Sequence, residues 1–169
     1  MTGVPRVDIR PAELDDVPAV RALRLRALES DPDAFGETYE RASARPDADY
    51  AEWIGAPENA MFLGVDADGA PVGMAVGAPA PVDDLPRPAA LYAMWVAPEA
   101  RGQGVGGALI DAVVGWARDQ GYDRIGLGVT TTNEPAMRLY ERKGFIDIGE
   151  TYPLREGSDL VIRIMAKQL

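Results

Sequence analysis

The residues best suited to chemistry begin with a cluster of glycines beside an arginine, at residues 101–107. This segment joins a predicted buried strand to a predicted helix, and glycine lets the backbone approach a ligand closely. The first N–H groups of a helix have no partner within it and lie at the positive end of its dipole. Arg101 can add a charge-assisted contact. The segment therefore predicts a phosphate or pyrophosphate site, with a glycine-rich turn that binds nothing as the simpler alternative.

Two common phosphate-binding motifs do not explain this segment. A Walker A loop has Lys and then Ser or Thr after its glycines, and neither follows here. Gly102, Gly104 and Gly107 match the G-x-G-x-x-G pattern of dinucleotide-binding domains. Those domains also need an acid at the end of the second strand, about 20 residues further on. Asp123 comes before the next predicted strand, which ends without an acid, so a dinucleotide site is disfavoured.

A second candidate site combines an amide and a phenol on one predicted helix. Asn133 and Tyr140 are seven residues apart, about two helical turns, and Met137 lies between them. Residues at this spacing share a face of the helix, so Asn133 and Tyr140 can meet one ligand. The alternative is that Tyr140 packs its ring against a sheet.

The composition excludes several mechanisms. The 169 residues contain no His and no Cys, which rules out an imidazole base, a thiol nucleophile, a disulfide and a zinc finger. Chemistry must therefore use carboxylates, tyrosine, hydroxyl groups, Lys, Arg or the backbone. We expect no metal in the site.

The excess negative charge lies in the first hundred residues. The chain has 17 Lys and Arg against 27 Asp and Glu, a net charge of −10. Residues 1–100 hold 8 basic and 18 acidic residues, whereas residues 101–169 hold 9 of each. This acidity argues against nucleic-acid binding, which needs a basic surface. The nine acids between Glu29 and Glu58 form either a solvated surface or one that attracts a cationic partner.

Both candidate sites must be positioned by a mixed sheet. Hydrophobic periodicity, turn residues and caps predict strands at 7–10, 60–65, 72–76, 89–96, 124–129, 145–151 and 160–166, and helices from Asp15 or Asp16 to about 29, at 48–54, at 104–120 and from Asn133 to Gly144. Residues 31–45 are expected to be irregular. The order predicts a mixed α/β fold in a single domain over residues 1–169. The sequence shows no signal peptide and no apolar run of about 18 residues, so we expect a cytoplasmic protein without membrane contact.

Two motifs together resemble the GCN5-related N-acetyltransferase (GNAT) superfamily. The first, Arg/Gln-x-x-Gly-x-Gly/Ala, matches at Arg101, Gly104 and Gly106 and is preceded by Met-Trp-Val-Ala-Pro at residues 94–98. The second, Asn-x-x-Ala-x-x-x-Tyr-x-x-x-Gly-Phe, has its five fixed residues at Asn133, Ala136, Tyr140, Gly144 and Phe145. The predicted order of elements agrees with this family over essentially the whole chain.

The resemblance implies a GNAT acyl-CoA N-acyltransferase fold, with a mostly antiparallel mixed sheet, splayed fourth and fifth strands and flanking helices. It implies acetyl-CoA as the cofactor and Tyr140 as the acid that protonates the leaving thiolate, after direct attack by a primary amine. A phenol, with a reference pKa near 10, can support this thiolate as a hydrogen-bond donor. The residues that the resemblance places against the cofactor are Met94, Trp95, Val96, Arg101, Gly102, Gln103, Gly104, Val105, Gly106, Asn133, Met137 and Tyr140.

The general base is open, because the predicted strand at 89–96 contains no acid where many relatives have one. Water can take the proton, the amine can arrive unprotonated, or an acid from elsewhere can serve, namely Glu37, Glu40, Asp83 or Asp84.

In the family that the chain resembles, the first two helices and their connection build much of the acceptor side. Here these elements contain the acidic residues between Glu29 and Glu58, which favours a small cationic amine as the acceptor. The candidate acceptor-binding residues are Glu37, Tyr39, Glu40, Asp83 and Asp84, with Phe35 and Trp53 as further aromatic contacts. The alternatives are a non-catalytic acyl-CoA-binding module and an acetyltransferase of protein N-termini or lysines. Some members of the family dimerise, so a homodimer is open as well.

Overall fold

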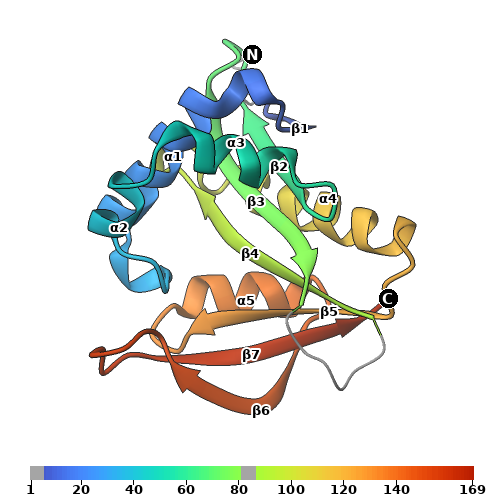
Figure 1. The fold of residues 1–169 in the computed structure, drawn as a ribbon. Coiled ribbons are helices and arrows are strands. Elements are labelled where there is room, and N and C mark those ends of the chain that lie inside the picture. Colours follow the sequence, from blue (N-terminus) through green and yellow to red (C-terminus); the bar gives the residue numbers. More distant parts are fainter. Residues whose placement is uncertain (1–5, 81–86) are drawn as a thin grey trace.

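A computed structural model describes residues 6–80 and 87–169, and all seven of its strands join one sheet. The strands are β1 (Asp8–Pro11), β2 (Ala60–Val65), β3 (Pro71–Pro79), β4 (Pro88–Val96), β5 (Arg124–Thr130), β6 (Ile146–Pro153) and β7 (Val161–Gln168). Their order across the sheet is β1-β2-β3-β4-β5-β7-β6, and every neighbouring pair is antiparallel except β4 and β5. The expected mixed sheet is confirmed (Figure 1).

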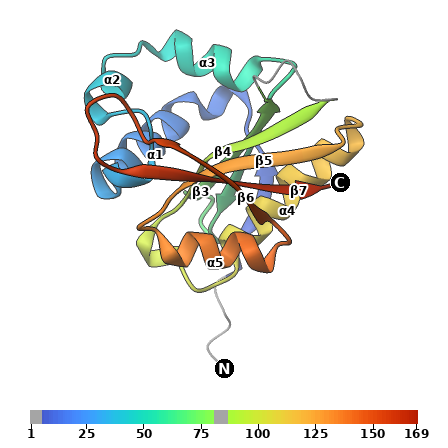
Figure 2. The same cartoon turned by 90° about the horizontal axis from the view of Figure 1, so that it is seen from below.

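The helices cover both faces of this sheet. They are α1 (Val17–Ser30), α2 (Tyr39–Ser43), α3 (Asp47–Gly55), α4 (Val105–Asp119) and α5 (Glu134–Arg142), with short 3-10 turns at Leu14–Asp16, Pro32–Ala34 and Pro98–Ala100. Figure 2 shows α1, α2 and α3 on one face and α4 and α5 on the other. Within the described residues, no helix has both the length and the apolar character needed to cross a membrane.

The parallel pair β4 and β5 is joined over a short stretch only. Pro88, Ala89 and Ala90 pair with Arg124, Ile125 and Gly126, and the ladder ends there. The two strands then diverge, as Figure 1 shows. Beyond Ala90, the edge of β4 that faces β5 has no strand beside it, so its peptide groups can bond to another molecule. The splayed strands expected for this fold are thus present.

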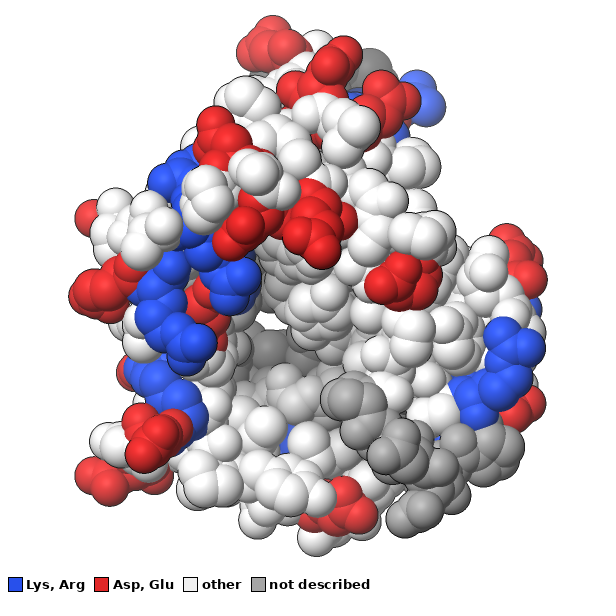
Figure 3. Space-filling model, viewed as in Figure 1, with Lys and Arg blue, Asp and Glu red and all other residues white. Residues whose placement is uncertain are grey.

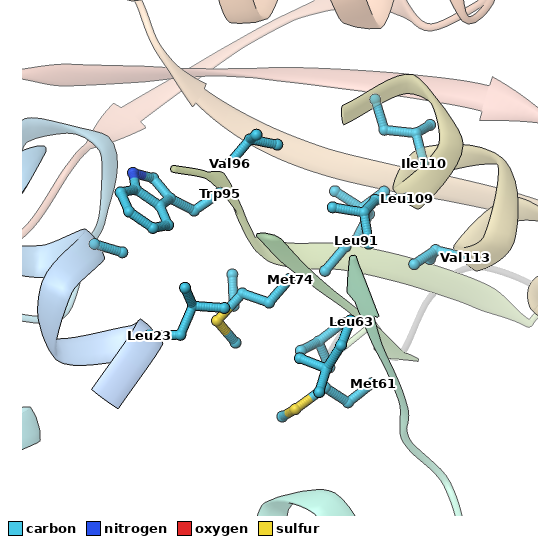
Figure 4. Close-up of a cluster of buried hydrophobic side chains, with 14 of the residues drawn as sticks. Leu23, Met61, Leu63, Met74, Leu91, Trp95, Val96, Leu109, Ile110 and Val113 are labelled. Atoms are coloured by element: carbon cyan, nitrogen blue, oxygen red, sulfur yellow. The ribbon is translucent and has the colours of Figure 1, made fainter. Parts of the chain in front are cut away.

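The core forms where α4 packs on β2, β3 and β4. Leu109, Ile110 and Val113 of α4 are fully buried, and Leu109 and Val113 lie beside Leu63 and Leu91 (Figure 4). Fully burying one such side chain contributes about 1.5–3 kcal/mol. Because this packing fixes α4, it also fixes the glycine segment at the start of α4.

Most elements lie where the sequence predicts them, but the region between α1 and α3 differs. Residues 31–45 were expected to be irregular, yet they contain the turn at Pro32–Ala34 and the helix α2. Thr38 caps α2, with its hydroxyl oxygen accepting from the Arg41 N–H at 3.3 Å. Asp16 is the N-cap residue of α1 as expected, but its carboxylate makes no hydrogen bond to the helix and instead accepts from Arg10 at 2.7 and 2.8 Å.

Candidate active site

A bulge in β4 marks the centre of the candidate site. Ala93 has φ +50°, a left-handed conformation that costs an L-residue about 1–2 kcal/mol. The register between β3 and β4 shifts here, and the side-chain alternation reverses. Tyr92 therefore accepts from Trp53 of α3 at 2.8 Å, whereas Met94 reaches the opposite face and lies beside Gly106 of α4. Strained residues of this kind concentrate at functional sites.

A cleft of about 440 Å³ opens between β4 and β5, where the two strands diverge. Its walls come from the end of β4, the glycine segment, the end of β5 and one face of α5. The lining residues are Asp31, Ala34, Met94, Trp95, Val96, Ala100, Arg101, Gly102, Gly104, Val105, Gly106, Gly107, Gly128, Val129, Thr130, Asn133, Pro135, Ala136, Leu139, Tyr140 and Arg142. Ten of the twelve cofactor residues expected from the sequence are in this set, and Gln103 and Met137 are not.

The glycine segment fits a pyrophosphate group. Gly104 precedes the first turn of α4 with φ +80°, and no side chain caps that turn. The first N–H groups of α4 therefore face open space with the positive end of the helix dipole behind them. At Gly106, a Cβ would lie 3.0 Å from both Leu139 Cδ2 and Met94 Cε. A side chain at this position would require the ends of Leu139 and Met94 to shift by a few tenths of an ångström, so the small size of glycine favours this close approach.

Arg101 lines the cleft but is held by the protein. Its Nε donates to the Val96 carbonyl oxygen at 2.9 Å, and its Nη2 donates to Asp31 Oδ2 at 2.9 Å. The indole Nε1 of Trp95 donates to the same carboxylate oxygen at 2.7 Å. Burial raises the pKa of Asp31, but the hydrogen bonds from Trp95 and Arg101 outweigh this effect and lower it below its usual value. Asp31 is therefore a stable carboxylate that fixes Arg101.

Tyr140 and Asn133 lie on the far wall of the cleft. Asn133 caps α5, with its side-chain oxygen accepting from the Ala136 N–H at 3.3 Å. Tyr140 is 7% exposed, and its ring packs edge-on against Phe145 with 5.9 Å between centroids. Burial alone raises the pKa of Tyr140 far above its usual value. The phenol is therefore held in its neutral form, which is a weaker acid than an ordinary phenol but can still donate a hydrogen bond.

A second hollow, of about 520 Å³, lies on the α1–α3 side of β4 and reaches the bulge at Tyr92. It is lined by Arg24, Glu37, Arg45, Asp49, Tyr50, Glu52, Trp53, Ala56, Glu58, Asn59 and Tyr92. Figure 3 shows a depression on this face, with both acidic and basic side chains around it. Tyr92 lines this hollow and Met94 lines the cleft, so the two spaces lie on opposite faces of β4 at the bulge, and they share no lining residue.

The expected acceptor-binding residues are distributed unevenly. Glu37 lines the second hollow, where its two carboxylate oxygens accept from Arg24 at 3.1 Å and from Arg45 at 2.7 Å. Tyr39 and Glu40 are exposed and line neither space. Asp83 and Asp84 lie outside the described residues.

Comparison with known protein families identifies the family of this chain. The sequence profile described as "Acetyltransferase (GNAT) family" matches residues 24–145. The chain belongs to the GNAT family. The match begins in α1 and ends after α5, so it includes the glycine segment, the β4 bulge and the Asn133–Tyr140 face. Members of this family use acetyl-CoA, and the cleft contains ten of the twelve residues expected to hold it.

Known proteins similar to this GNAT chain agree with that assignment. Mycothiol acetyltransferase of Propionibacterium freudenreichii subsp. shermanii is 32% identical over 131 residues, covering 78% of this chain but only 40% of that protein. The chain thus spans less than half the length of this relative. Ribosomal-protein-alanine N-acetyltransferase from Brucella melitensis has the same fold, with TM-score 0.80, 24% identity and coverage of 96% of this chain and 99% of that one. A Salmonella typhimurium protein described as an acetyltransferase and solved with its cofactor acetyl-CoA has TM-score 0.81, 20% identity and coverage of 97% and 94%.

Two features of this GNAT site were missed from sequence. The bulge at Ala93 gives no local signal, because nothing about an alanine predicts a positive φ. Arg24 was also missed, although its position carries a signal. It lies on the buried stripe of α1 with Val20 and Leu28, four residues from each, and is itself buried. A charge on an apolar stripe needs a partner, and Glu37 provides one.

Proposed function

We propose that this chain transfers an acetyl group from acetyl-CoA to a primary amine of a small cationic molecule. One observation supports this most directly: a single cleft runs from the uncapped first turn of α4 to the buried hydroxyl-bearing ring of Tyr140 and lies across β4 from a second hollow at the bulge. A cofactor and an acceptor can thus approach each other from the two sides of β4.

The residues of the cleft fit the parts of acetyl-CoA. The pyrophosphate would lie against the first N–H groups of α4 and the segment from Gly102 to Gly106. The pantetheine arm would run along the open edge of β4 at Met94, Trp95 and Val96, beyond the last β4–β5 pair. Bound there, acetyl-CoA supplies its acetyl group as a reactive thioester.

Tyr140 would act at the sulfur. Its hydroxyl is protonated at neutral pH, as in any ordinary tyrosine, burial raises its pKa further, and Tyr140 lines the cleft from α5. A donor at this position stabilises the negative charge that develops on the departing sulfur and can pass its proton there. The amine would attack the thioester directly, a route that needs no Cys nucleophile, and the chain has none.

The proton from the attacking amine needs another route. Glu37 is a candidate base that lines the second hollow, but both of its carboxylate oxygens already accept hydrogen bonds from arginines. Asp31 has a lowered pKa and is therefore a weak base. We assign this proton to water in the second hollow, or to solvent before the amine enters.

The second hollow is suited to an acceptor that carries positive charge. Asp49, Glu52 and Glu58 contribute negative charge, and the faces of Trp53 and Tyr92 are stacked with 6.1 Å between centroids. Carboxylates raise the local concentration of a cation, and aromatic faces attract it at short range. These features support the choice of a cationic amine.

The test is release of free CoA from acetyl-CoA with a panel of cationic, neutral and acidic amines, measured at several salt concentrations. We expect cationic amines to give the highest kcat/KM and to lose the most as salt rises, because salt screens exposed charges. A neutral or acidic amine as the best acceptor would contradict the charge argument. Tight acetyl-CoA binding without turnover of any amine would indicate an acyl-CoA-binding module, and a strong preference for peptides would indicate a protein acetyltransferase.

A further inference from the structure

The inner wall of the second hollow contains a buried arginine whose hydrogen-bonding groups are mostly unused. Arg24 lies on α1, its side chain is 9% exposed, and its Nη2 donates to Glu37 Oε2 at 3.1 Å. Its Nε and Nη1 are buried and have no hydrogen-bond partner among the described residues. A buried guanidinium with free N–H groups is costly unless a further group meets it.

The charges around Arg24 leave this end of the hollow positive. Glu37 is shared with Arg45, whose Nε donates to Glu37 Oε1 at 2.7 Å, so one carboxylate serves two guanidinium groups. Phe35 adds an aromatic face 4.7 Å from Arg24 Cζ, which compensates only part of the charge. Burial lowers the pKa of Arg24 despite the opposing effect of Glu37, so its desolvation is not fully offset. A second anion beside the two guanidinium groups would balance the positive charge that Glu37 leaves.

The opposite wall carries charge of the other sign. Asp49, Glu52 and Glu58 line it, and within the described part of the chain none of these three has an ion-pair partner. The hollow therefore has a positive end at Arg24 and Arg45 and a negative wall at these acids.

We propose that the acceptor carries a carboxylate as well as its amines, as a diamino acid does, and that this carboxylate binds at Arg24 and Arg45. This inference rests on the proposed function and specifies the acceptor's class. A carboxylate matches the planar donor array of a guanidinium. Arg45 is half exposed and would make the direct contact, while Arg24, which lines the same hollow and shares Glu37 with Arg45, attracts the anion by its charge in low-dielectric surroundings. The acids opposite would hold the ammonium groups.

Binding of a matched pair of probes tests this without requiring turnover. Ornithine and putrescine both carry two amines and differ in one carboxylate, and each is titrated calorimetrically into the CoA-bound protein. We expect ornithine to bind about tenfold more tightly, as a charge-assisted hydrogen bond implies. Arg45→Gln and Arg24→Gln should each remove most of this preference. Arg41→Gln is the matched control, because Arg41 is exposed on α2 and does not line the hollow.

Each outcome is decisive. Equal or tighter binding of putrescine, no binding of either probe, or an unchanged preference in Arg45→Gln would overturn the inference. If Arg24→Gln does not fold, Arg45→Gln alone decides, since Arg45 is half exposed. CoA release is measured in parallel. Preference for ornithine without CoA release would refute the proposed function but support the anion site. CoA release without a preference for ornithine would support the proposed function but refute the anion site.

Discussion

Arg101 donates to Asp31 across 2.9 Å, and this ion pair joins the start of the glycine segment to the end of α1. The sequence suggests Arg101 as a phosphate ligand, whereas in the structure the protein itself occupies its guanidinium. Its second bond, from Nε to the Val96 carbonyl at 2.9 Å, secures the end of β4. We therefore propose that pyrophosphate binds mainly to the backbone N–H groups of α4, which need no side chain to act.

The pair predicts a stability change with a definite pH dependence. Asp31→Asn removes the charged acceptor of Arg101 and Trp95, and we expect it to lower the free energy of unfolding at pH 7 by about 1 kcal/mol, given partial solvent screening. The pKa of Asp31 is lowered in the folded protein. The stability that its ionised form contributes is therefore present above the pKa of the unfolded chain and is lost as pH falls through the folded pKa.

Urea unfolding of the wild type and Asp31→Asn, measured from pH 7 down to about pH 3, checks this prediction. The two unfolding curves should converge at the acid end. A difference that stays constant with pH would show that Asp31 acts through packing and not through its charge. Asp33→Asn, at an exposed position two residues away, is the control.

Tyr140→Phe separates catalysis from cofactor binding. Loss of the hydroxyl removes the donor to the departing sulfur but keeps the ring that packs on Phe145. We expect kcat to fall about 100-fold, in the range for a lost general acid, while the Kd for acetyl-CoA changes less than about twofold. Single-turnover kinetics and calorimetry measure the two quantities.

Tyr122→Phe is the control for this substitution, because Tyr122 packs on Trp116 and does not line the cleft. Its kcat should match that of the wild type. Equal losses of kcat and of acetyl-CoA affinity in Tyr140→Phe would assign Tyr140 a structural role.

The sequence predicts those parts of the site whose structure depends on neighbouring residues in the chain. Asn133 is a good cap wherever a helix starts, and the glycines at 102 and 104 take the positive φ that only glycine adopts freely. The β4 bulge has no such cause, since Ala93 is forced into its conformation by the register between β3 and β4. The Arg24–Glu37 contact likewise depends on how α1 packs against the following segment, which no periodicity encodes.

Gly104→Val tests the glycine segment against a matched position. Gly104 and Gly69 have φ +80° and +81°, and at each a Cβ would meet nothing within 4 Å. Valine at either position should cost about 1–2 kcal/mol of stability from backbone strain. Gly104→Val should also abolish acetyl-CoA binding, because its side chain fills the space in front of the first turn of α4.

Gly69→Val serves as the control, since Gly69 lies in the β2–β3 turn outside the cleft. It should lose similar stability and still bind acetyl-CoA normally. Calorimetry and thermal unfolding on both variants give the comparison. Normal binding by a folded Gly104→Val protein would refute the assignment of the pyrophosphate site.

The dependence of rate on pH identifies where the amine's proton goes. If water takes it, no enzyme base titrates, and kcat/KM should rise with pH until the acceptor itself is deprotonated. Two acceptors whose amine pKa values differ by about one unit should then give profiles displaced by about one unit. Glu37→Gln should leave the shape of both profiles unchanged, although it removes the charge that pairs with Arg24 and Arg45. A single inflection common to both acceptors, and absent in Glu37→Gln, would instead identify Glu37 as the base.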